Sequence, residues 1–205
     1  MDSVKDLLKQ EFQVIDMSDL HWLLGIRIEY NKSNIALSQT SYIDKILKWF
    51  GLQIANPAIY PLDKNHNLSN KGKEVEHLGY NNFKAGFPTT ILDTVNVKQY
   101  QQMIGSLMYT VTRMRPDLAF TVTPLSQFLT QPTKYYIRAA KHVLRYLKGT
   151  RDLKLLFPLG QTQQYLTFEG FTNSNFAGCL DTHQSTSGYV FKLAGATICW
   201  RSHKQ

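Results

Sequence analysis

The sequence predicts an α+β protein in which helices dominate the first part and an antiparallel sheet closes the chain. Apolar residues recur at the helical period in five segments, near residues 4–12, 40–51, 100–115, 116–129 and 133–149. Alternating β-branched and aromatic residues indicate three strands, near residues 165–173, 188–193 and 196–200. With 205 residues, 43% of them hydrophobic, the chain suits one ordinary domain or two small ones.

The N-terminal elements follow from local patterns. Val4, Leu7, Leu8 and Phe12 share one face of a first helix. A strand pair is expected over 20–30 and 34–39, joined by a polar turn, and a short helix then begins at Thr40 or Ser41 and ends at Gly51.

Residues 61–97 are rich in Asn and Gly without a sustained period, so we expect a linker there. The next helix should stop before Pro116, and the one that begins there should be interrupted at Pro124. A third helix should run from about Thr133 and end at Gly149, and Gly195 favours a tight turn between the last two strands.

Composition excludes several classes of protein. No run approaches the roughly 18 apolar residues that span a bilayer, and the first residues lack the pattern of a signal peptide, so no membrane partner is expected. Cys179 and Cys199 are too few for a disulfide framework and have no metal-ligand spacing. We expect small buried thiols in an intracellular protein, either cytoplasmic or nuclear.

The net charge of +8 lies in the second half of the chain. Residues 1–100 hold 11 basic and 11 acidic residues, whereas residues 101–205 hold 12 basic and 4 acidic residues. Five cations of the third helix fall within a stripe of roughly 80°, and no acidic residue lies between them. They are Lys134, Arg138, Lys141, Arg145 and Lys148. This basic stripe favours contact with nucleic-acid phosphates, and the alternative is a solvated outer face.

Several strings carry a resemblance to a known family. They are Trp22-Leu23-Leu24-Gly25-Ile26, Leu37-Ser38-Gln39, Ile104-Gly105-Ser106-Leu107-Met108-Tyr109, Arg115-Pro116-Asp117-Leu118-Ala119-Phe120, Leu144-Arg145-Tyr146-Leu147-Lys148-Gly149-Thr150 and Ser185-Thr186-Ser187-Gly188-Tyr189-Val190-Phe191. In this order they resemble the Pol polyprotein of copia-type LTR retrotransposons. The resemblance covers nearly the whole chain and is poor over residues 61–97.

The resemblance implies four regions. Residues 1–60 would form the end of a reverse transcriptase, with Trp22, Leu23, Leu24 and Gly25 as a primer-grip hairpin and the start of the thumb behind it. Residues 61–97 would be the linker, and residues 98–160 a helical connection that includes the basic helix. Residues 161–205 would be a truncated, ribonuclease H-like three-stranded sheet.

The same resemblance argues against catalysis. Both enzymes of the family use two Mg²⁺ ions held by carboxylates. The Tyr-x-Asp-Asp pair of the polymerase has no counterpart here, and Asn173 and Asn175 stand where ribonuclease H has two aspartates. The family's next glutamate has no counterpart before Gln205. Because an amide oxygen cannot neutralise Mg²⁺, we expect no metal site and no cofactor.

We therefore expect a non-catalytic part of a Pol polyprotein whose family performs RNA-directed DNA synthesis and ribonuclease H cleavage. Its partners would be an RNA–DNA hybrid or duplex, or other Pol fragments. Three alternatives stay open: an inert remnant, a domesticated binding module that interferes with active elements, and an enzyme fragment complemented by a separate polymerase palm.

Overall fold

The computed structural model describes residues 2–13, 19–62, 96–160, 167–176 and 182–205. Five α-helices lie in these residues: α1 (Asp2–Glu11), α2 (Thr40–Trp49), α3 (Val97–Arg113), α4 (Ala119–Leu125) and α5 (Lys134–Gly149). The strands are β1 (Trp22–Leu23), β2 (Ile26–Tyr30), β3 (Asn34–Ser38), β4 (Lys154–Pro158), β5 (Phe168–Asn175), β6 (Thr186–Leu193) and β7 (Ala196–Lys204). The fold is therefore α+β, as the sequence predicts. No helix among the described residues is both long and apolar enough to cross a membrane.

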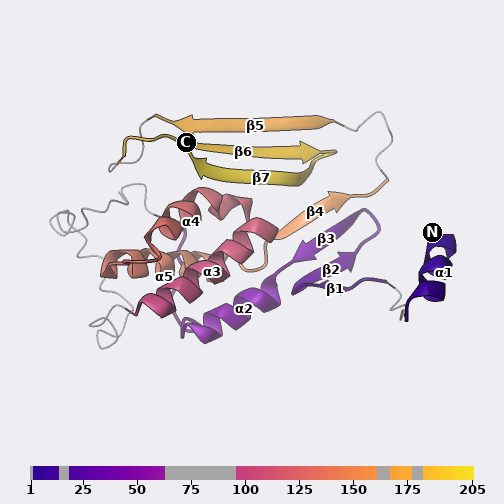
Figure 1. The fold of residues 1–205 in the computed structure, drawn as a ribbon, viewed down its shortest axis with the longest axis horizontal. Coiled ribbons are helices and arrows are strands. Elements are labelled where there is room, and N and C mark those ends of the chain that lie inside the picture. The colour runs from indigo at the N-terminus through magenta and orange to yellow at the C-terminus, as the bar shows by residue number, and fades with distance from the viewer. Residues whose placement is uncertain (1, 14–18, 63–95, 161–166, 177–181) are drawn as a thin grey trace.

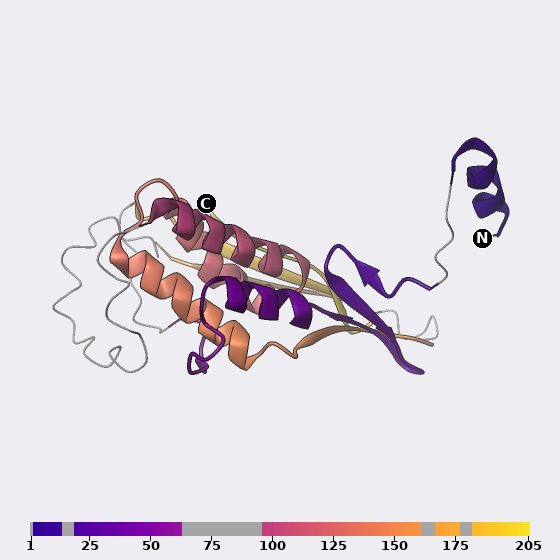
Figure 2. The same ribbon diagram turned by 90° about the horizontal axis from the view of Figure 1, so that it is seen from below.

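The core lies between helices α2, α3, α4 and α5, which pack side by side (Figure 2). Each helix contributes the apolar face that its sequence period predicts, for example Ile46 from α2, Leu107 from α3 and Leu144 from α5, all nearly inaccessible to solvent. The Tyr100 hydroxyl is buried in this core and donates to the carbonyl of Leu125 at 2.8 Å. Burial raises the pKa of this phenol.

The predicted helix over residues 116–129 is broken into three pieces. A 3₁₀ turn at Pro116–Leu118 precedes α4, and a second 3₁₀ turn at Ser126–Phe128 follows it. Helix α4 ends at Leu125, one residue after Pro124, which has no N–H to donate to a helical hydrogen bond. The predicted linker 61–97 lies almost entirely outside the described residues.

Two antiparallel sheets flank the helices (Figure 1). The first has the order β1-β2-β3-β4, and it differs from the sequence prediction in two ways. The expected strand over 20–30 is divided by a two-residue turn at Leu24-Gly25, and β4 was not expected. Strand β4 pairs along all of β3, from Asn34 opposite Pro158 to Ser38 opposite Lys154.

A buried arginine joins the end of α3 to the end of α5. The Arg115 side chain is 4% exposed, and its guanidinium donates twice to the Asp117 carboxylate, at 2.9 and 2.7 Å. It also donates to the carbonyl and hydroxyl of Thr150, at 3.2 and 2.7 Å. The Tyr146 hydroxyl donates to the same carboxylate at 3.1 Å. This network holds the point at which the chain leaves α5 and enters β4.

The second sheet has the order β5-β6-β7, which confirms the predicted three antiparallel strands. Ala194 and Gly195 form its last turn, both with positive φ, as the glycine predicts. One face packs on the helices: the Trp200 indole donates to the carbonyl of Val111 at 2.8 Å, and Thr123 donates to the carbonyl of Ser202. Cys199 points the other way and is exposed. The prediction of a buried thiol was therefore wrong for Cys199, because nothing among the described residues covers that face.

Candidate nucleic-acid interface

The basic stripe lies on the side of α5 that faces away from the core, and its two halves differ in their exposure to solvent. Lys134 and Arg138 are exposed, whereas Lys141, Arg145 and Lys148 are partly buried. Burial lowers the pKa of Lys141, because a charged ammonium loses hydration there. The stripe therefore presents its first two cations to solvent more fully than its last three.

The segment after α2 covers the C-terminal half of the stripe. Arg145 Nε donates to the carbonyl of Asn56 at 2.6 Å, and Lys148 Nζ donates to the carbonyl of Ala55 at 2.8 Å. The amide of Ala58 donates back to the carbonyl of Arg145 at 3.2 Å. These contacts give two stripe cations a structural role. Carbonyl acceptors carry no net charge, so the positive potential of the stripe persists.

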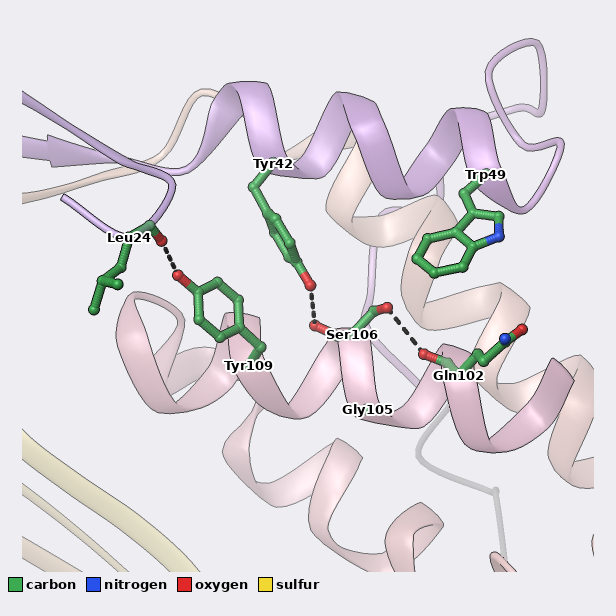
Figure 3. A pocket seen from close by; sticks show the side chains of 7 residues that line it. All are labelled: Leu24, Tyr42, Trp49, Gln102, Gly105, Ser106 and Tyr109. Carbon is green, nitrogen blue, oxygen red and sulfur yellow. Dashed lines mark hydrogen bonds between the residues drawn. The ribbon is translucent and has the colours of Figure 1, made fainter. Parts of the chain in front are cut away.

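The hairpin that resembles a primer grip is held against α3. Leu24 and Gly25 form its turn with φ values of 50° and 77°, as two-residue hairpin turns require. Tyr109 of α3 donates a hydrogen bond from its hydroxyl to the carbonyl of Leu24 (Figure 3). Trp22, Leu23 and Leu24 are about half exposed or more. The turn is thus fixed by its backbone while its side chains face solvent.

A pocket of about 450 Å³ opens beside this turn, between α2 and α3 (Figure 3). It is lined by Leu24, Tyr42, Trp49, Gln102, Gly105, Ser106 and Tyr109. The rings of Tyr42 and Tyr109 are 4.8 Å apart, and the Tyr42 hydroxyl donates to the carbonyl of Ser106 at 3.5 Å. Trp49 is 61% exposed. We call this region the α2–α3 groove.

Cations lie on the two helices that line the α2–α3 groove. Lys45 lies three residues after Tyr42 and four before Trp49, so it shares their face of α2. On α3, Lys98 lies four residues before Gln102, and the Arg113 guanidinium stands 6.0 Å from the Tyr109 ring centre. Asp44 is the one acidic residue of these two helices, and it pairs with Arg151 at 2.8 Å. The groove therefore combines exposed aromatic surface with an excess of positive charge, as nucleic-acid sites do.

Asn173 lies in the middle of β5, opposite Gly188, and is exposed. The second asparagine has a structural partner, because the Asn175 side-chain oxygen accepts from the amide of Thr186 at 2.6 Å. Glu169 is the acidic residue on this strand. Within the described ranges no three His, Cys, Asp or Glu side chains gather as a metal site would require. Asp181 falls outside the described residues.

Sequence reasoning missed the α2–α3 groove and the Arg115 network. Gly105 and Tyr109 belong to one of the strings that carry the family resemblance, but the sequence assigns neither of them a role in a site. Trp49 was not predicted to have a functional role. The sequence did hold a signal for the groove. Aromatic and cationic residues recur three or four positions apart in both α2 and α3, and two such helices placed face to face would bring these side chains together. The basic stripe was found, but not the backbone carbonyls that its last cations contact.

Comparison with known proteins identifies similar chains. The retrovirus-related Pol polyprotein from transposon TNT 1-94 of Nicotiana tabacum is 33% identical over 98% of this chain, which spans 14% of that protein. The corresponding polyprotein from transposon RE1 of Arabidopsis thaliana is 32% identical over 98% of this chain, which spans 12% of it. The uncharacterized mitochondrial protein AtMg00810 of Arabidopsis thaliana is 29% identical, and this chain spans 73% of its length.

No family model and no solved structure matches the chain. The two polyproteins align with nearly every residue of it, including the strings that carry the resemblance. The chain therefore belongs to the retrovirus-related Pol polyproteins of copia-type transposons and corresponds to a part of them.

Proposed function

We propose that this chain is a non-catalytic part of a Pol polyprotein that holds an RNA–DNA hybrid or a duplex along the α2–α3 groove. The groove itself carries the proposal: the turn that Tyr109 fixes and three aromatic side chains line one pocket, and cations lie on the same two helices. Cations engage phosphates, and aromatic faces pack on sugars or bases.

The family provides a role for each element of this surface. The β1–β2 turn corresponds to the hairpin that positions the 3′ end of the primer, and α2 corresponds to the start of the thumb. Helices α3 to α5 correspond to the connection, and β5–β7 to the first strands of ribonuclease H. The hydrogen bond from Tyr109 to Leu24 supports this proposal, because it fixes the turn beside the groove.

The absence of catalysis is the second part of the proposal. Two-metal chemistry requires clustered carboxylates to hold and neutralise Mg²⁺. Asn173 presents a neutral amide at the resembling position. We infer that the chain binds nucleic acid without cleaving or extending it.

The test is the affinity of the full chain for a fluorescein-labelled RNA–DNA hybrid, measured by anisotropy at low salt. In the groove variant, Lys45→Gln with Arg113→Gln, we expect affinity to fall about tenfold or more, because two phosphate contacts are lost. The stripe variant, Lys134→Gln with Arg138→Gln, measures the separate contribution of α5.

The matched control removes the same charge elsewhere, with Lys32→Gln in the β2–β3 turn and Lys192→Gln on β6. We expect it to bind nearly as well as the unmodified chain. Equal losses in all three double variants would mean that binding follows net charge, and the groove would have no role. No binding at low salt would favour the inert remnant instead.

A further inference from the structure

Residues 55–60 cross the C-terminal half of α5, and we call this segment the strap (Figure 2). It is anchored at both ends, because Leu52 before it is buried and Leu62 after it packs against the core. Between these anchors its large side chains face solvent: Ile59 is 83% exposed and Tyr60 is 69% exposed. The strap therefore lies on α5 with its backbone inward and its large side chains outward.

The strap contacts α5 through its backbone. Three of its carbonyls, at distances of 2.6 to 2.9 Å, accept hydrogen bonds from three basic side chains of α5, which are His142, Arg145 and Lys148. The amide of Ala58 donates in return to the carbonyl of Arg145 at 3.2 Å. Gly149 permits this close approach, since a Cβ atom there would stand 3.0 Å from the Cβ atom of Pro57. The donors of Arg145 and Lys148 are thus engaged by the chain itself.

The strap leaves the charge of the stripe uncompensated. Residues 52–62 contain no charged side chain, and no acidic residue lies between Lys134 and Arg151. Carbonyl oxygens accept hydrogen bonds from the cations but do not neutralise them. A phosphate oxygen offers the same donors a negative charge as well as a lone pair. A chain of phosphates can therefore compete with the strap for these donors.

The strap is also weakly held compared with the helix beneath it. Between its anchors it buries no large apolar side chain, whereas Leu144 and Leu147 of α5 are fully buried. Segments with few buried apolar contacts open locally at a lower free energy than a packed core, and lids are drawn from such segments. Local opening of the strap therefore does not require the four helices to separate.

We propose that the strap is a reversible autoinhibitory contact on the basic stripe. When it is closed, its carbonyls occupy the donors of Arg145 and Lys148. A chain of phosphates displaces it and engages these two cations together with the exposed half of the stripe. Inorganic polyphosphate and a nucleic-acid backbone share this chemistry. The inference concerns the strap and the stripe, and it does not depend on the α2–α3 groove.

The test is amide hydrogen exchange of the full chain, followed by NMR with inorganic polyphosphate in one arm and the RNA–DNA hybrid in another. Opening breaks the hydrogen bond from the Ala58 amide to Arg145, so a displacing anion should speed exchange at Ala58 by about threefold or more. The Leu107 amide in α3 is the reference and should not change.

The two arms distinguish the source of the phosphates. Faster exchange with polyphosphate shows that phosphate charge is sufficient, and faster exchange with the hybrid alone assigns the strap to a duplex backbone; either result supports the proposal. An anion that binds over a closed strap slows exchange at Ala58 or leaves it unchanged. That result in both arms would overturn the proposal.

A charge variant tests which cations the anion reaches. Arg145→Gln with Lys148→Gln should abolish the effect of the anion on Ala58 exchange, because the competed donors are gone. Lys32→Gln with Lys192→Gln removes the same charge elsewhere and should keep the effect. If the first variant keeps it as well, the anion does not act through Arg145 and Lys148, and the proposal fails.

A reversible lock tests the closed state directly. Pro57→Cys with Gly149→Cys, in a chain with Cys179→Ser and Cys199→Ser, places two Cβ atoms 3.0 Å apart. This distance is close to the roughly 3.5–4.5 Å of disulfides, so oxidation should tie the strap to α5 after a small shift. We expect the oxidised protein to bind the displacing anion about 3- to 10-fold more weakly than the same protein reduced.

Equal affinities of the oxidised and reduced proteins would contradict autoinhibition. The lock leaves Lys45 and Arg113 unchanged, and polyphosphate has no bases to stack. Loss of hybrid binding in the groove variant, with the response of Ala58 to polyphosphate retained, therefore separates this proposal from the proposed function.

Discussion

Tyr109 connects the β1–β2 turn to helix α3. Its hydroxyl donates to the carbonyl of Leu24, its ring centre lies 4.8 Å from that of Tyr42, and the Arg113 guanidinium stands 6.0 Å from it. Leu24 has a φ of 50°, which costs a non-glycine residue of order 1 kcal/mol. The hydrogen bond helps to offset that cost. The resemblance predicts the turn, but it cannot predict this contact, because the two residues are 85 positions apart.

Arg115 gives a stability prediction. Arg115→Lys keeps the charge, but an ammonium cannot reproduce the two bonds to Asp117 and the two to Thr150. We expect the free energy of unfolding to fall by about 1–3 kcal/mol in urea denaturation. Arg113→Lys on the exposed side of α3 is the control and should change it by less than about 0.5 kcal/mol. Equal effects would show that the Arg115 network is not a stabilising element.

Asn173 gives a prediction on metal chemistry. With a neutral amide in this position, we expect no cleavage of an RNA–DNA hybrid in Mg²⁺ or Mn²⁺, and we expect none from Asn173→Asp, since one carboxylate does not hold two metal ions. A gel of the labelled hybrid measures cleavage, and an active ribonuclease H in the same buffer serves as the positive control. Hydrolysis by the unmodified chain that a chelator abolishes would contradict the non-catalytic proposal.

In helix α5, the local sequence predicts which side chains share a face, but it does not predict which distant residues they contact. Its period predicts the buried face and the stripe, and both are observed from Lys134 to Gly149. The partners of Arg145 and Lys148 come from residues 55–56, about 90 positions earlier, and no local pattern indicates them. Binding through the stripe remains a prediction. Its exposed first turns, with Lys134 and Arg138, are the part best placed to reach a phosphate.

Helix α3 gives a prediction through Gly105. A Cβ atom at this position would meet nothing within 4 Å, so Gly105→Ala should stabilise the fold by about 0.5–1 kcal/mol through helix propensity. Gly51→Ala is the control and should destabilise it by about 1 kcal/mol, because Gly51 has a φ of 66°. Thermal unfolding measures both changes.

Gly105 also tests the groove. Gly105→Leu places a larger side chain in the α2–α3 groove, and we expect weaker hybrid binding with the fold retained. Unchanged hybrid affinity in a folded Gly105→Leu protein would show that nucleic acid does not enter the groove.

Across the whole molecule, the sequence predicts individual helices and strands better than it predicts which of them pair or pack together. The helices and the β5–β7 sheet were predicted, because each depends on a local period or on a tight turn. The pairing of β3 with β4 was missed, because it joins Asn34 to Pro158, which lie far apart in the sequence, and β4 is a run of only five residues. The α2–α3 groove was missed for the same reason, since α2 and α3 are separated by residues 50–96.

The attachment of the β5–β7 sheet gives a prediction for the whole molecule. Trp200 anchors β7 on the helices, so Trp200→Leu should destabilise the protein by about 2–3 kcal/mol. Hydrogen exchange should show faster exchange in β6 and β7, and an isolated peptide of residues 161–205 should lack protected amides. Phe171→Leu on exposed β5 is the control. Strong protection in the isolated peptide would show that the sheet is stable without the helices.

The most direct test of the account is the salt dependence of hybrid binding by the unmodified chain. Cations around the α2–α3 groove should engage two to four phosphates, which gives a slope of log K against log salt between about −1.8 and −3.6. Anisotropy titrations between roughly 50 and 200 mM salt measure this slope. We expect binding at the lowest salt and a slope within that range. A slope near zero, or no binding at the lowest salt, would contradict the proposal that this chain holds nucleic acid.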